Sequence, residues 1–255
     1  MPVFTKFLKR IADLIITSII WIYFTLGFLV LFSPVYLVVL VFARDHEISF
    51  QRLNNIFYKS FFFLIRALVP GLKIDIHGDL FSVSSSVIIC NHLSYLDPIL
   101  LISLFPRHRT IVKGVFFNVP VFGSVLKFSG YIPSSTNGSV SSLMVDKMQD
   151  LGDYLSSGGN LFIFPEGTRS RNGRIGRFHE GGFKIARRFN APIKVLRITN
   201  THQLFPPGKF LFNSCMNNTI KVRLIGNLDP DYESKTFSIS DLIERVRSLF
   251  EGNTR

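Results

Sequence analysis

The sequence predicts an α/β fold with a mixed central sheet flanked by helices, preceded by an N-terminal membrane-embedded helical hairpin. Short apolar runs rich in β-branched residues alternate along the chain with longer segments of helical pattern, which is typical of α/β domains. The 30 residues from Leu14 to Ala43 contain no charged side chain. At 255 residues the chain is long enough for one sizeable domain plus an appendage. We therefore expect apolar membrane-binding helices in residues 1–48 and an α/β domain in residues 49–255.

The apolar N-terminal segment has an unusual length. As one helix it would measure about 45 Å, whereas one bilayer crossing needs about 20 residues. Pro34 lies inside the segment and predicts a break or kink. We expect two helices, roughly at residues 11–31 and 34–44, that form a hairpin embedded in one leaflet. The alternatives are a single tilted, kinked transmembrane helix and a buried soluble helix pair. A cleaved signal peptide is disfavoured, because the apolar region is too long and lacks a clear small-residue cleavage site.

Positive charge surrounds this segment. Basic residues flank it on both sides, with Lys6, Lys9 and Arg10 before it and Arg44 and Arg52 after it. Such flanks predict that both ends of the hairpin are cytoplasmic, at the inner membrane if the protein is bacterial. The net charge of +12 indicates an anionic partner. Zinc-ligand spacing and RNP-like aromatic motifs are missing from the sequence, so we expect membrane lipids rather than nucleic acid.

The remaining elements follow in alternation. Residues 72–77 read LKIDIH and alternate apolar with polar side chains, as a half-buried strand does. On similar grounds we expect strands at 72–77, 87–90, 110–112, 130–133 (strand or turn), 161–164, 192–198 and 219–225. We expect helices at 50–69, 98–104, 119–128, 140–155, 181–189 and 240–250.

The segment NHLSYLD, from Asn91 to Asp97, directly follows an apolar strand. A neutral imidazole takes up a proton near pH 7, and a carboxylate on its other nitrogen fixes its orientation. His92 and Asp97 form such a pair if the segment curls into a helical turn. A structural histidine beside a strand is the alternative. The pair lacks an obvious protein nucleophile, since Cys90 is expected to pack as a small apolar residue. His92 is therefore expected to activate a hydroxyl of the substrate.

A second polar segment, FPEGTRS from Phe164 to Ser170, also follows an apolar strand. Gly167 lets the backbone approach a ligand closely, and the planar guanidinium of Arg169 suits a phosphate. Glu166 either accepts hydrogen bonds from hydroxyls or anchors the loop. A solvated basic loop is the alternative. Four further basic residues raise the local positive potential: Arg171, Arg174, Arg177 and Lys184.

Together the two segments resemble the blocks of the glycerolipid acyltransferase family, typified by 1-acylglycerol-3-phosphate acyltransferases. NHLSYLD resembles the family's first block, NHxSxxD, and FPEGTRS matches its third block. The second block is represented by Lys113, Pro120 and Gly123, and the start of the fourth by Ala191, Pro192 and Ile193. The resemblance covers about residues 72–226. The apolar N-terminal segment resembles the family's membrane-binding helices.

This resemblance implies a membrane-bound O-acyltransferase of phospholipid biosynthesis. It would move a fatty acyl group from acyl-CoA or acyl-ACP to the hydroxyl of a lysophospholipid, above all 1-acylglycerol-3-phosphate. His92 would be the general base, and Asp97 would orient it. The substrate-binding residues would be Asn91, Lys113, Glu166, Gly167, Thr168 and Arg169. The acyl carrier is a co-substrate, and the resemblance implies no metal and no further cofactor.

Three departures from the family pattern concern the acceptor. The family's second block ends in an arginine, but residues 130–135 (GYIPSS) contain none. His179 stands where the family has lysine, and the second proline of the fourth block is missing. The hypothesis that follows is a different lyso-lipid headgroup, such as that of lyso-ornithine lipid. Compensation by another basic residue is the alternative, with Arg109, Lys113 and Arg171 as the candidates.

Other classes of protein remain as rivals. A non-catalytic lipid-binding or membrane-shaping protein on the same fold is disfavoured, because His92 and Asp97 are both intact. A serine hydrolase has little support, because the sequence contains no Gly-x-Ser-x-Gly elbow. A transacylase that moves acyl chains between phospholipids would share the first block and stays open.

Overall fold

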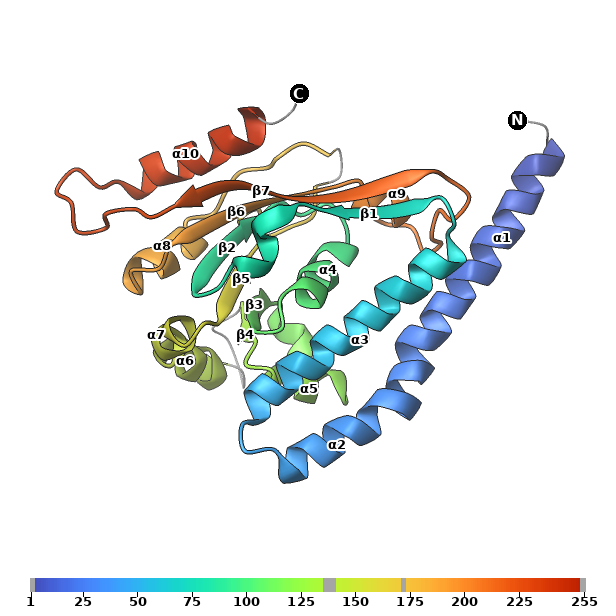
Figure 1. Cartoon of the computed structure of the whole chain (residues 1–255), viewed down its shortest axis with the longest axis horizontal. Helices are drawn as coiled ribbons and strands as arrows, with labels where there is room; N and C mark the ends of the chain where they lie inside the picture. Colours follow the sequence, from blue (N-terminus) through green and yellow to red (C-terminus); the bar gives the residue numbers. More distant parts are fainter. Residues whose placement is uncertain (1–2, 135–140, 171–172, 253–255) are drawn as a thin grey trace.

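The computed structural model describes residues 3–134, 141–170 and 173–252, and it has a seven-stranded sheet at its centre (Figure 1). The order of the strands is β1-β7-β6-β2-β5-β3-β4. All adjacent strands are parallel except β6 and β7, so the sheet is mixed, as predicted. The strands are β1 (Leu72–Ile76), β2 (Ser86–Cys90), β3 (His108–Val112), β4 (Ile132–Pro133), β5 (Asn160–Ile163), β6 (Ile193–Thr199) and β7 (Asn218–Leu228).

Helices cover both faces of this sheet. Val87 and Ile89 of β2 belong to one buried cluster and Ile88 and Cys90 to another, because side chains alternate along a strand. The first cluster packs under α8 (Gly181–Arg188) and α10 (Ile239–Gly252), and the second under α3 (His46–Leu68) and α4 (Leu96–Leu104) (Figure 1). Burial on both faces explains why β2 reads as a continuous apolar run.

Several predicted helices differ in their limits. The predicted helix at 119–128 is shorter and begins later, as α5 (Phe122–Phe128), and a 3₁₀ turn, η3 (Gly114–Asn118), precedes it. The predicted helix at 140–155 is divided into α6 (Ser141–Gln149) and α7 (Leu151–Ser156); its first residue, 140, lies outside the described residues. The other short helical elements are η2 (Gly78–Ser82) and α9 (Thr201–Leu204).

The N-terminal hairpin turns at a different place from the predicted one. Of the predicted break or kink at Pro34, the break is wrong, since the helix runs on through α1 (Val3–Ile22), η1 (Tyr23–Phe32) and α2 (Ser33–Phe42). The helix does change direction between α1 and α2 (Figure 1). The η1 segment is π-helical, and this wider turn directly before Pro34 accommodates the proline ring and its missing N–H. The chain reverses at residues 43–45, where Asp45 Oδ1 caps α3 by accepting from Ile48 N at 2.9 Å. The returning arm is therefore α3, and the predicted domain boundary at 48/49 lies inside it (Figure 1).

On helix α1 two polar side chains face the protein, while several apolar side chains face outward. Asp13 and Thr17 are buried: Asp13 Oδ1 accepts from Ser214 N at 2.8 Å, and Thr17 Oγ1 accepts from Phe212 N at 2.9 Å. Leu14 and Ile15, by contrast, are 53% and 54% exposed. Among the described residues, one helical segment, Phe4–Phe42, is long and apolar enough to cross a membrane. On a water-facing helix the apolar side chains face the core. At Asp13, Leu14, Ile15 and Thr17 of α1 the polar side chains are buried and the apolar ones are exposed.

Candidate active site

Both motifs lie at one edge of the sheet. Because β6, β2, β5 and β3 are adjacent and mutually parallel, their carboxyl ends meet at the same edge. In open α/β sheets ligands bind at this edge. It carries His92 after β2, Glu166 to Arg169 after β5, Lys113 after β3 and Thr201 after β6. The topology thus assembles side chains that are far apart in the sequence.

His92 and Asp97 form the predicted pair. The Nδ1 atom of His92 lies 3.0 Å from Oδ2 of Asp97, which is fully buried. Oδ2 also accepts hydrogen bonds from the backbone N–H groups of Leu93 at 2.5 Å and Ser94 at 2.7 Å, because the motif curls into the first turn of α4. An ionised carboxylate suits this place, since it meets backbone donors near a helix N-terminus. With Nδ1 turned to Asp97, Nε2 is the ring nitrogen available to act as a base.

Thr201 completes the surroundings of Asp97, and the sequence reasoning missed it. Its hydroxyl Oγ1 donates to Oδ1 of Asp97 at 2.5 Å, and Thr201 is fully buried. The two residues are 104 positions apart, so no local spacing signals their contact. Ser94 also joins the loop of Asp97 to the segment around α9, because its hydroxyl donates to the carbonyl of Phe205, just beyond α9, at 2.9 Å. The aspartate is therefore held from both its own loop and α9.

The ring of His92 is positioned from one side by Phe164, the first residue of the second motif. Their ring centroids lie 4.3 Å apart with planes inclined by 26°. The neighbouring Cys90 is fully buried in the apolar cluster, as expected. Burial, with the carboxylates of Asp97 and Glu166 nearby, raises the pKa of the Cys90 thiol well above its usual value. A thiol in this state is a poor nucleophile.

Glu166 anchors the two motifs to each other. Its Oε1 accepts from His92 N at 3.1 Å, and its Oε2 accepts from Gly176 N at 2.8 Å. The backbone N–H of Ser170 also donates to the carbonyl of His92 at 2.8 Å. Of the two roles that the sequence left open for Glu166, anchoring the loop is the one in this geometry. The carboxylate orients its neighbours, and its role in substrate binding stays a prediction.

Asn91 joins two adjacent strands of the sheet through its side chain. The side chain is buried, its Nδ2 donates to Ile198 O at 2.9 Å and its Oδ1 accepts from Ile198 N at 2.8 Å. Both ends of the amide are thus used to join the end of β2 to β6. These two contacts are structural, and the role of Asn91 in substrate binding stays a prediction.

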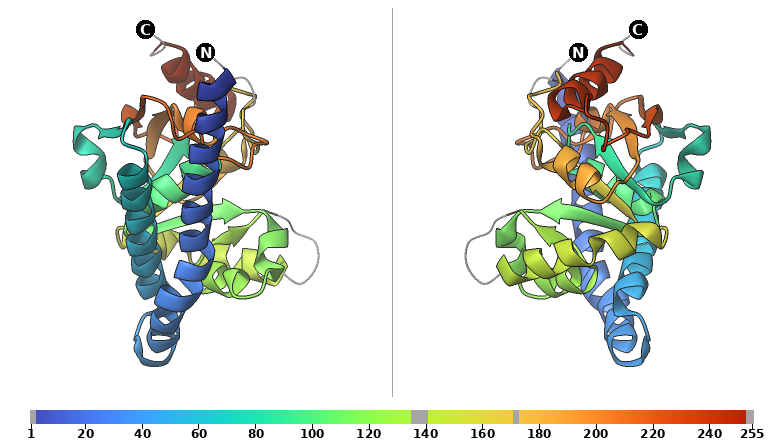
Figure 2. Two further views of the ribbon diagram at one scale, coloured as in Figure 1. Left: turned by 90° about the vertical axis from the view of Figure 1, so that its right-hand side faces the viewer. Right: turned by 90° about the vertical axis from the view of Figure 1, so that its left-hand side faces the viewer.

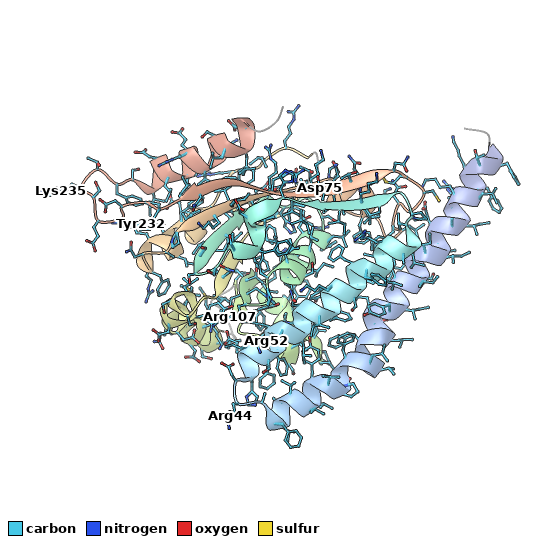
Figure 3. The ribbon with its side chains drawn as sticks, viewed as in Figure 1. Arg44, Arg52, Asp75, Arg107, Tyr232 and Lys235 are labelled. Carbon is cyan, nitrogen blue, oxygen red and sulfur yellow. The ribbon has the colours of Figure 1, made fainter. Side chains whose placement is uncertain are left out.

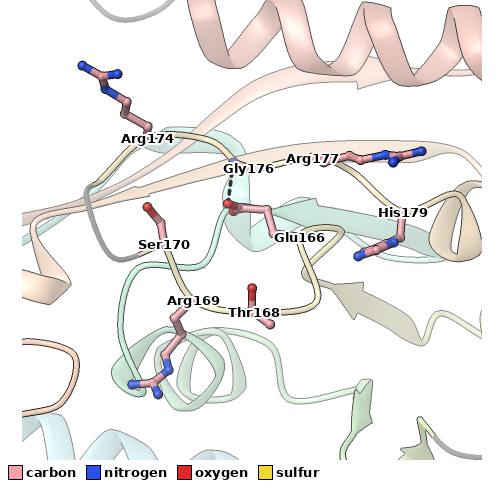
Figure 4. Close-up of a pocket in the computed structure, with 8 residues that line it drawn as sticks. All are labelled: Glu166, Thr168, Arg169, Ser170, Arg174, Gly176, Arg177 and His179. Carbon is pink, nitrogen blue, oxygen red and sulfur yellow. Dashed lines mark hydrogen bonds between the residues drawn. The ribbon is translucent and has the colours of Figure 1, made fainter.

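A basic pocket lies over the second motif. Its volume is about 430 Å³, and it is lined by Glu166, Thr168, Arg169, Ser170, Arg174, Gly176, Arg177 and His179 (Figure 4). Gly167, at a φ of 65°, makes the turn of this loop in the left-handed region that glycine tolerates. The guanidinium of Arg169 points away from those of Arg174 and Arg177 (Figure 4) and lies over the Tyr95 ring, with Cζ 3.3 Å from the centroid. Its Nη1 is buried without a hydrogen-bond partner, so it is a donor ready for an anion.

The basic residues that could replace the missing second-block arginine lie in different parts of the structure. Arg109 is buried and forms ion pairs with Glu47 at 2.6 Å and Asp150 at 2.7 Å, so its proposed role at the headgroup is wrong. Lys113 is exposed at the same sheet edge as His92 but does not line the basic pocket. Arg171 lies outside the described residues. His179, the replacement for the family's lysine, does line the pocket.

Comparison with known proteins agrees with this fold and motif arrangement. Residues 73–199 match the family model described as Acyltransferase. A chloroplast 1-acyl-sn-glycerol-3-phosphate acyltransferase of Brassica napus is 34% identical over 146 residues, which cover 56% of this chain and 42% of the relative. A 1-acyl-sn-glycerol-3-phosphate acyltransferase of Borreliella burgdorferi is 28% identical over 170 residues, covering 63% of this chain and 67% of the relative. The aligned part of this chain thus spans less than half of the Brassica protein.

Among solved structures, the 1-acyl-sn-glycerophosphate acyltransferase PlsC of Thermotoga maritima has the same fold. The TM-score is 0.72 at 19% identity, over 97% of this chain and 100% of that one. The fold, with a histidine–aspartate pair at the carboxyl edge of its sheet, defines a protein of the acyltransferase class. Within that class, this chain belongs to the glycerolipid acyltransferase family.

Proposed function

We propose that the protein is a membrane-associated O-acyltransferase that esterifies the free hydroxyl of 1-acylglycerol-3-phosphate in phospholipid biosynthesis. The donor is a fatty acyl thioester, acyl-CoA or acyl-ACP. The observation that carries this proposal is the His92–Asp97 pair, 3.0 Å apart, at the sheet edge that also holds the basic pocket. The names of the Brassica and Borreliella relatives support the same reaction and acceptor.

In this mechanism His92 transfers one proton. Nε2 of His92 accepts the proton of the acceptor hydroxyl as its oxygen attacks the thioester carbonyl. Asp97 stays ionised and stabilises the imidazolium, which then gives the proton to the departing thiolate. The products are an ester and a free thiol, and no bond forms to the protein. This accounts for a base–carboxylate pair without a nucleophilic side chain.

The basic pocket supports a phosphate-bearing acceptor. Arg174, Arg177 and His179 line one cavity together with Arg169, and a guanidinium group can form two parallel hydrogen bonds to a phosphate. These side chains provide basic groups in a chain that lacks the family's second-block arginine. The phosphate monoester is therefore preferred to a lyso-ornithine headgroup.

Membrane association is supported by the reversed polarity of α1. A helix that buries Asp13 and exposes Leu14 and Ile15 is stable where its outer face meets lipid. The basic residues on both sides of the apolar segment support a cytoplasmic location for the catalytic domain.

An acyl-transfer assay with reconstituted protein tests the proposal. Labelled acyl-CoA or acyl-ACP would be offered with 1-acylglycerol-3-phosphate, lysophosphatidylcholine or lyso-ornithine lipid. We expect transfer to the phosphate acceptor and a loss of about 10²–10⁴-fold in His92→Ala. The matched control is His77→Ala, because the His77 side chain is 73% exposed beyond the edge strand β1.

Three results would contradict the proposal. Transfer that survives His92→Ala would refute the base, and a preference for lyso-ornithine lipid would refute the acceptor. Transfer from a labelled phospholipid without any thioester would favour the transacylase.

A further inference from the structure

A short segment after β3 exposes a cluster of apolar side chains. In residues 114–121, hereafter the apolar loop, Val115 is 68% exposed, Phe116 41%, Val119 43% and Val121 47%. Single exposed apolar residues are ordinary, but a cluster within eight residues indicates a contact surface. The loop does not line the basic pocket and has no role in the mechanism above.

The backbone of the loop is held in a defined shape. Val121 has a φ of 64°, which is costly for a β-branched residue. The following Gly123 donates from its N–H to Val119 O at 2.7 Å. A Cβ atom on Gly123 would lie 2.2 Å from Phe117 O, so only glycine allows this close approach. The turn therefore presents its valines outward as a fixed surface.

The apolar loop lies beside the tip of the N-terminal hairpin. Helix α5, which follows the loop directly, packs on the hairpin: Val125 shares a buried cluster with Tyr36, and the rings of Phe128 and Phe50 lie 5.2 Å apart. Figure 2 shows η3 and α5 beside the lower end of the hairpin in its left-hand view. The outer side of α2 there is also apolar, with Val35, Leu37, Val38, Val41 and Phe42 exposed.

The charge around the loop identifies its partner. From Pro98 to Val145 the sequence contains no aspartate or glutamate. Lys113 and Lys127 are exposed on either side of the loop. Apolar side chains bordered by lysines match the interface of an anionic bilayer, where the apolar groups enter the acyl region and the ammonium groups meet the headgroups.

We propose that the apolar loop is a second lipid-contacting surface, which inserts into an anionic bilayer beside the N-terminal hairpin. This proposal rests on the membrane association proposed above but concerns a different part of the chain. A second contact beside the first limits how the α/β domain can be oriented on the membrane. It also brings Lys113, at the sheet edge that carries His92, to the level of the lipid headgroups.

Tryptophan fluorescence tests the insertion directly. The chain has one tryptophan, so Trp21→Phe gives a silent background for single reporters. We expect vesicles of phosphatidylglycerol with brominated acyl chains to quench Phe116→Trp. The control is Phe237→Trp, which should keep its fluorescence. The ring centroids of Phe237 and Tyr232 lie 5.2 Å apart, and Tyr232 is at the end of the molecule away from the hairpin (Figure 3).

A matched pair of valines tests the energetic contribution. Val119→Ser should weaken binding to phosphatidylglycerol vesicles about fivefold, as expected for a partly inserted apolar side chain. Val145→Ser should leave it unchanged, since Val145 is similarly exposed, at 54%, but lies on α6.

Two outcomes would overturn the proposal: an unquenched Phe116→Trp on protein that floats with the vesicles, or equal affinities of the two serine variants. If the protein fails to float with vesicles at all, the proposed membrane association fails as well. Flotation thus separates the two failures.

Discussion

At the scale of single residues, the most informative group is the carboxylate of Asp97. It accepts from His92, from two backbone N–H groups and from Thr201, all while fully buried. A buried charge is tolerated only when it is paired and hydrogen-bonded. The four donors therefore hold the aspartate in one position, and through it they hold the imidazole.

Thr201 provides a test of this positioning. Removing its hydroxyl in Thr201→Val takes one donor from a charged acceptor, a bond of about 1.5–3 kcal/mol. We expect kcat to fall at least about tenfold, with KM for both substrates unchanged and with activity restored in Thr201→Ser. Steady-state kinetics of the three proteins checks this.

A double variant separates positioning from general structural support. In an Asp97→Asn background, Thr201→Val should cause little further loss, since its route to His92 is already broken. Fully additive losses would show that Thr201 acts independently of Asp97.

At the scale of elements, helix α3 connects the hairpin to the α/β domain through buried polar side chains. Asn55 donates to the carbonyls of Ile102 and Ser103 at the end of α4, at 2.8 and 2.9 Å. Gln51 accepts from the backbone N–H of His108 at 3.1 Å. These bonds satisfy groups that would otherwise be buried without partners, and so they specify how α3 lies on the domain.

His108, the first residue of β3, makes the stability of this region depend on pH. It is fully buried, with Nδ1 2.6 Å from Phe105 O and Nε2 2.7 Å from the Tyr131 hydroxyl. Burial lowers the pKa of His108 to about 4. Between pH 4 and about pH 6.5 the imidazole therefore binds more protons in the unfolded chain than in the folded protein. The contribution of neutral His108 to the free energy of unfolding is complete above about pH 6.5 and is lost as the pH falls toward 4.

We expect the free energy of unfolding to drop by about 2 kcal/mol between pH 7 and pH 5 through His108 alone. Urea denaturation at the two pH values checks this. His108→Asn should reduce the drop, because it removes the buried imidazole. An unchanged pH dependence in His108→Asn would contradict the assignment.

At the scale of the whole molecule, the distribution of polar and apolar side chains supports the proposed action on a lipid at a membrane. The outer face of the hairpin and the apolar loop are apolar, whereas the catalytic edge of the sheet carries the histidine–aspartate pair and the basic pocket. A lipid acceptor has the same division between acyl chain and phosphate. The molecule is thus suited to work at an interface.

Polar substitutions on α1 test this arrangement. Leu14 and Ile15 are both more than half exposed, so Leu14→Asn with Ile15→Asn should leave the thermal unfolding of detergent-solubilised protein unchanged. The same pair should shift the protein from the membrane fraction toward the soluble fraction, because apolar area no longer enters lipid. The control is the exposed pair Arg187→Gln with Arg188→Gln on α8. Full membrane retention of the α1 variant would contradict the prediction.

The sequence by itself determined the parts of this protein that depend on near neighbours. The strands could be read from short β-branched runs, and the contact of His92 with Asp97 from a spacing of five residues that closes within one helical turn. Pro34 was misleading, because a π-helical turn accommodated it and the chain reversed only at residues 43–45. The family blocks indicated the chemistry but not the actual partner of each side chain.

Only the tertiary structure decided which side chains are available to a ligand. Arg109 and Asn91 looked suited to binding, but one is neutralised by Glu47 and Asp150 and the other is paired with Ile198. Thr201 had no signal of its own and became part of the site through the parallel pairing of β6 with β2. The physical reason is that burial and hydrogen-bond partners are set by segments that lie 41 to 107 residues apart in these examples, and no local pattern records them.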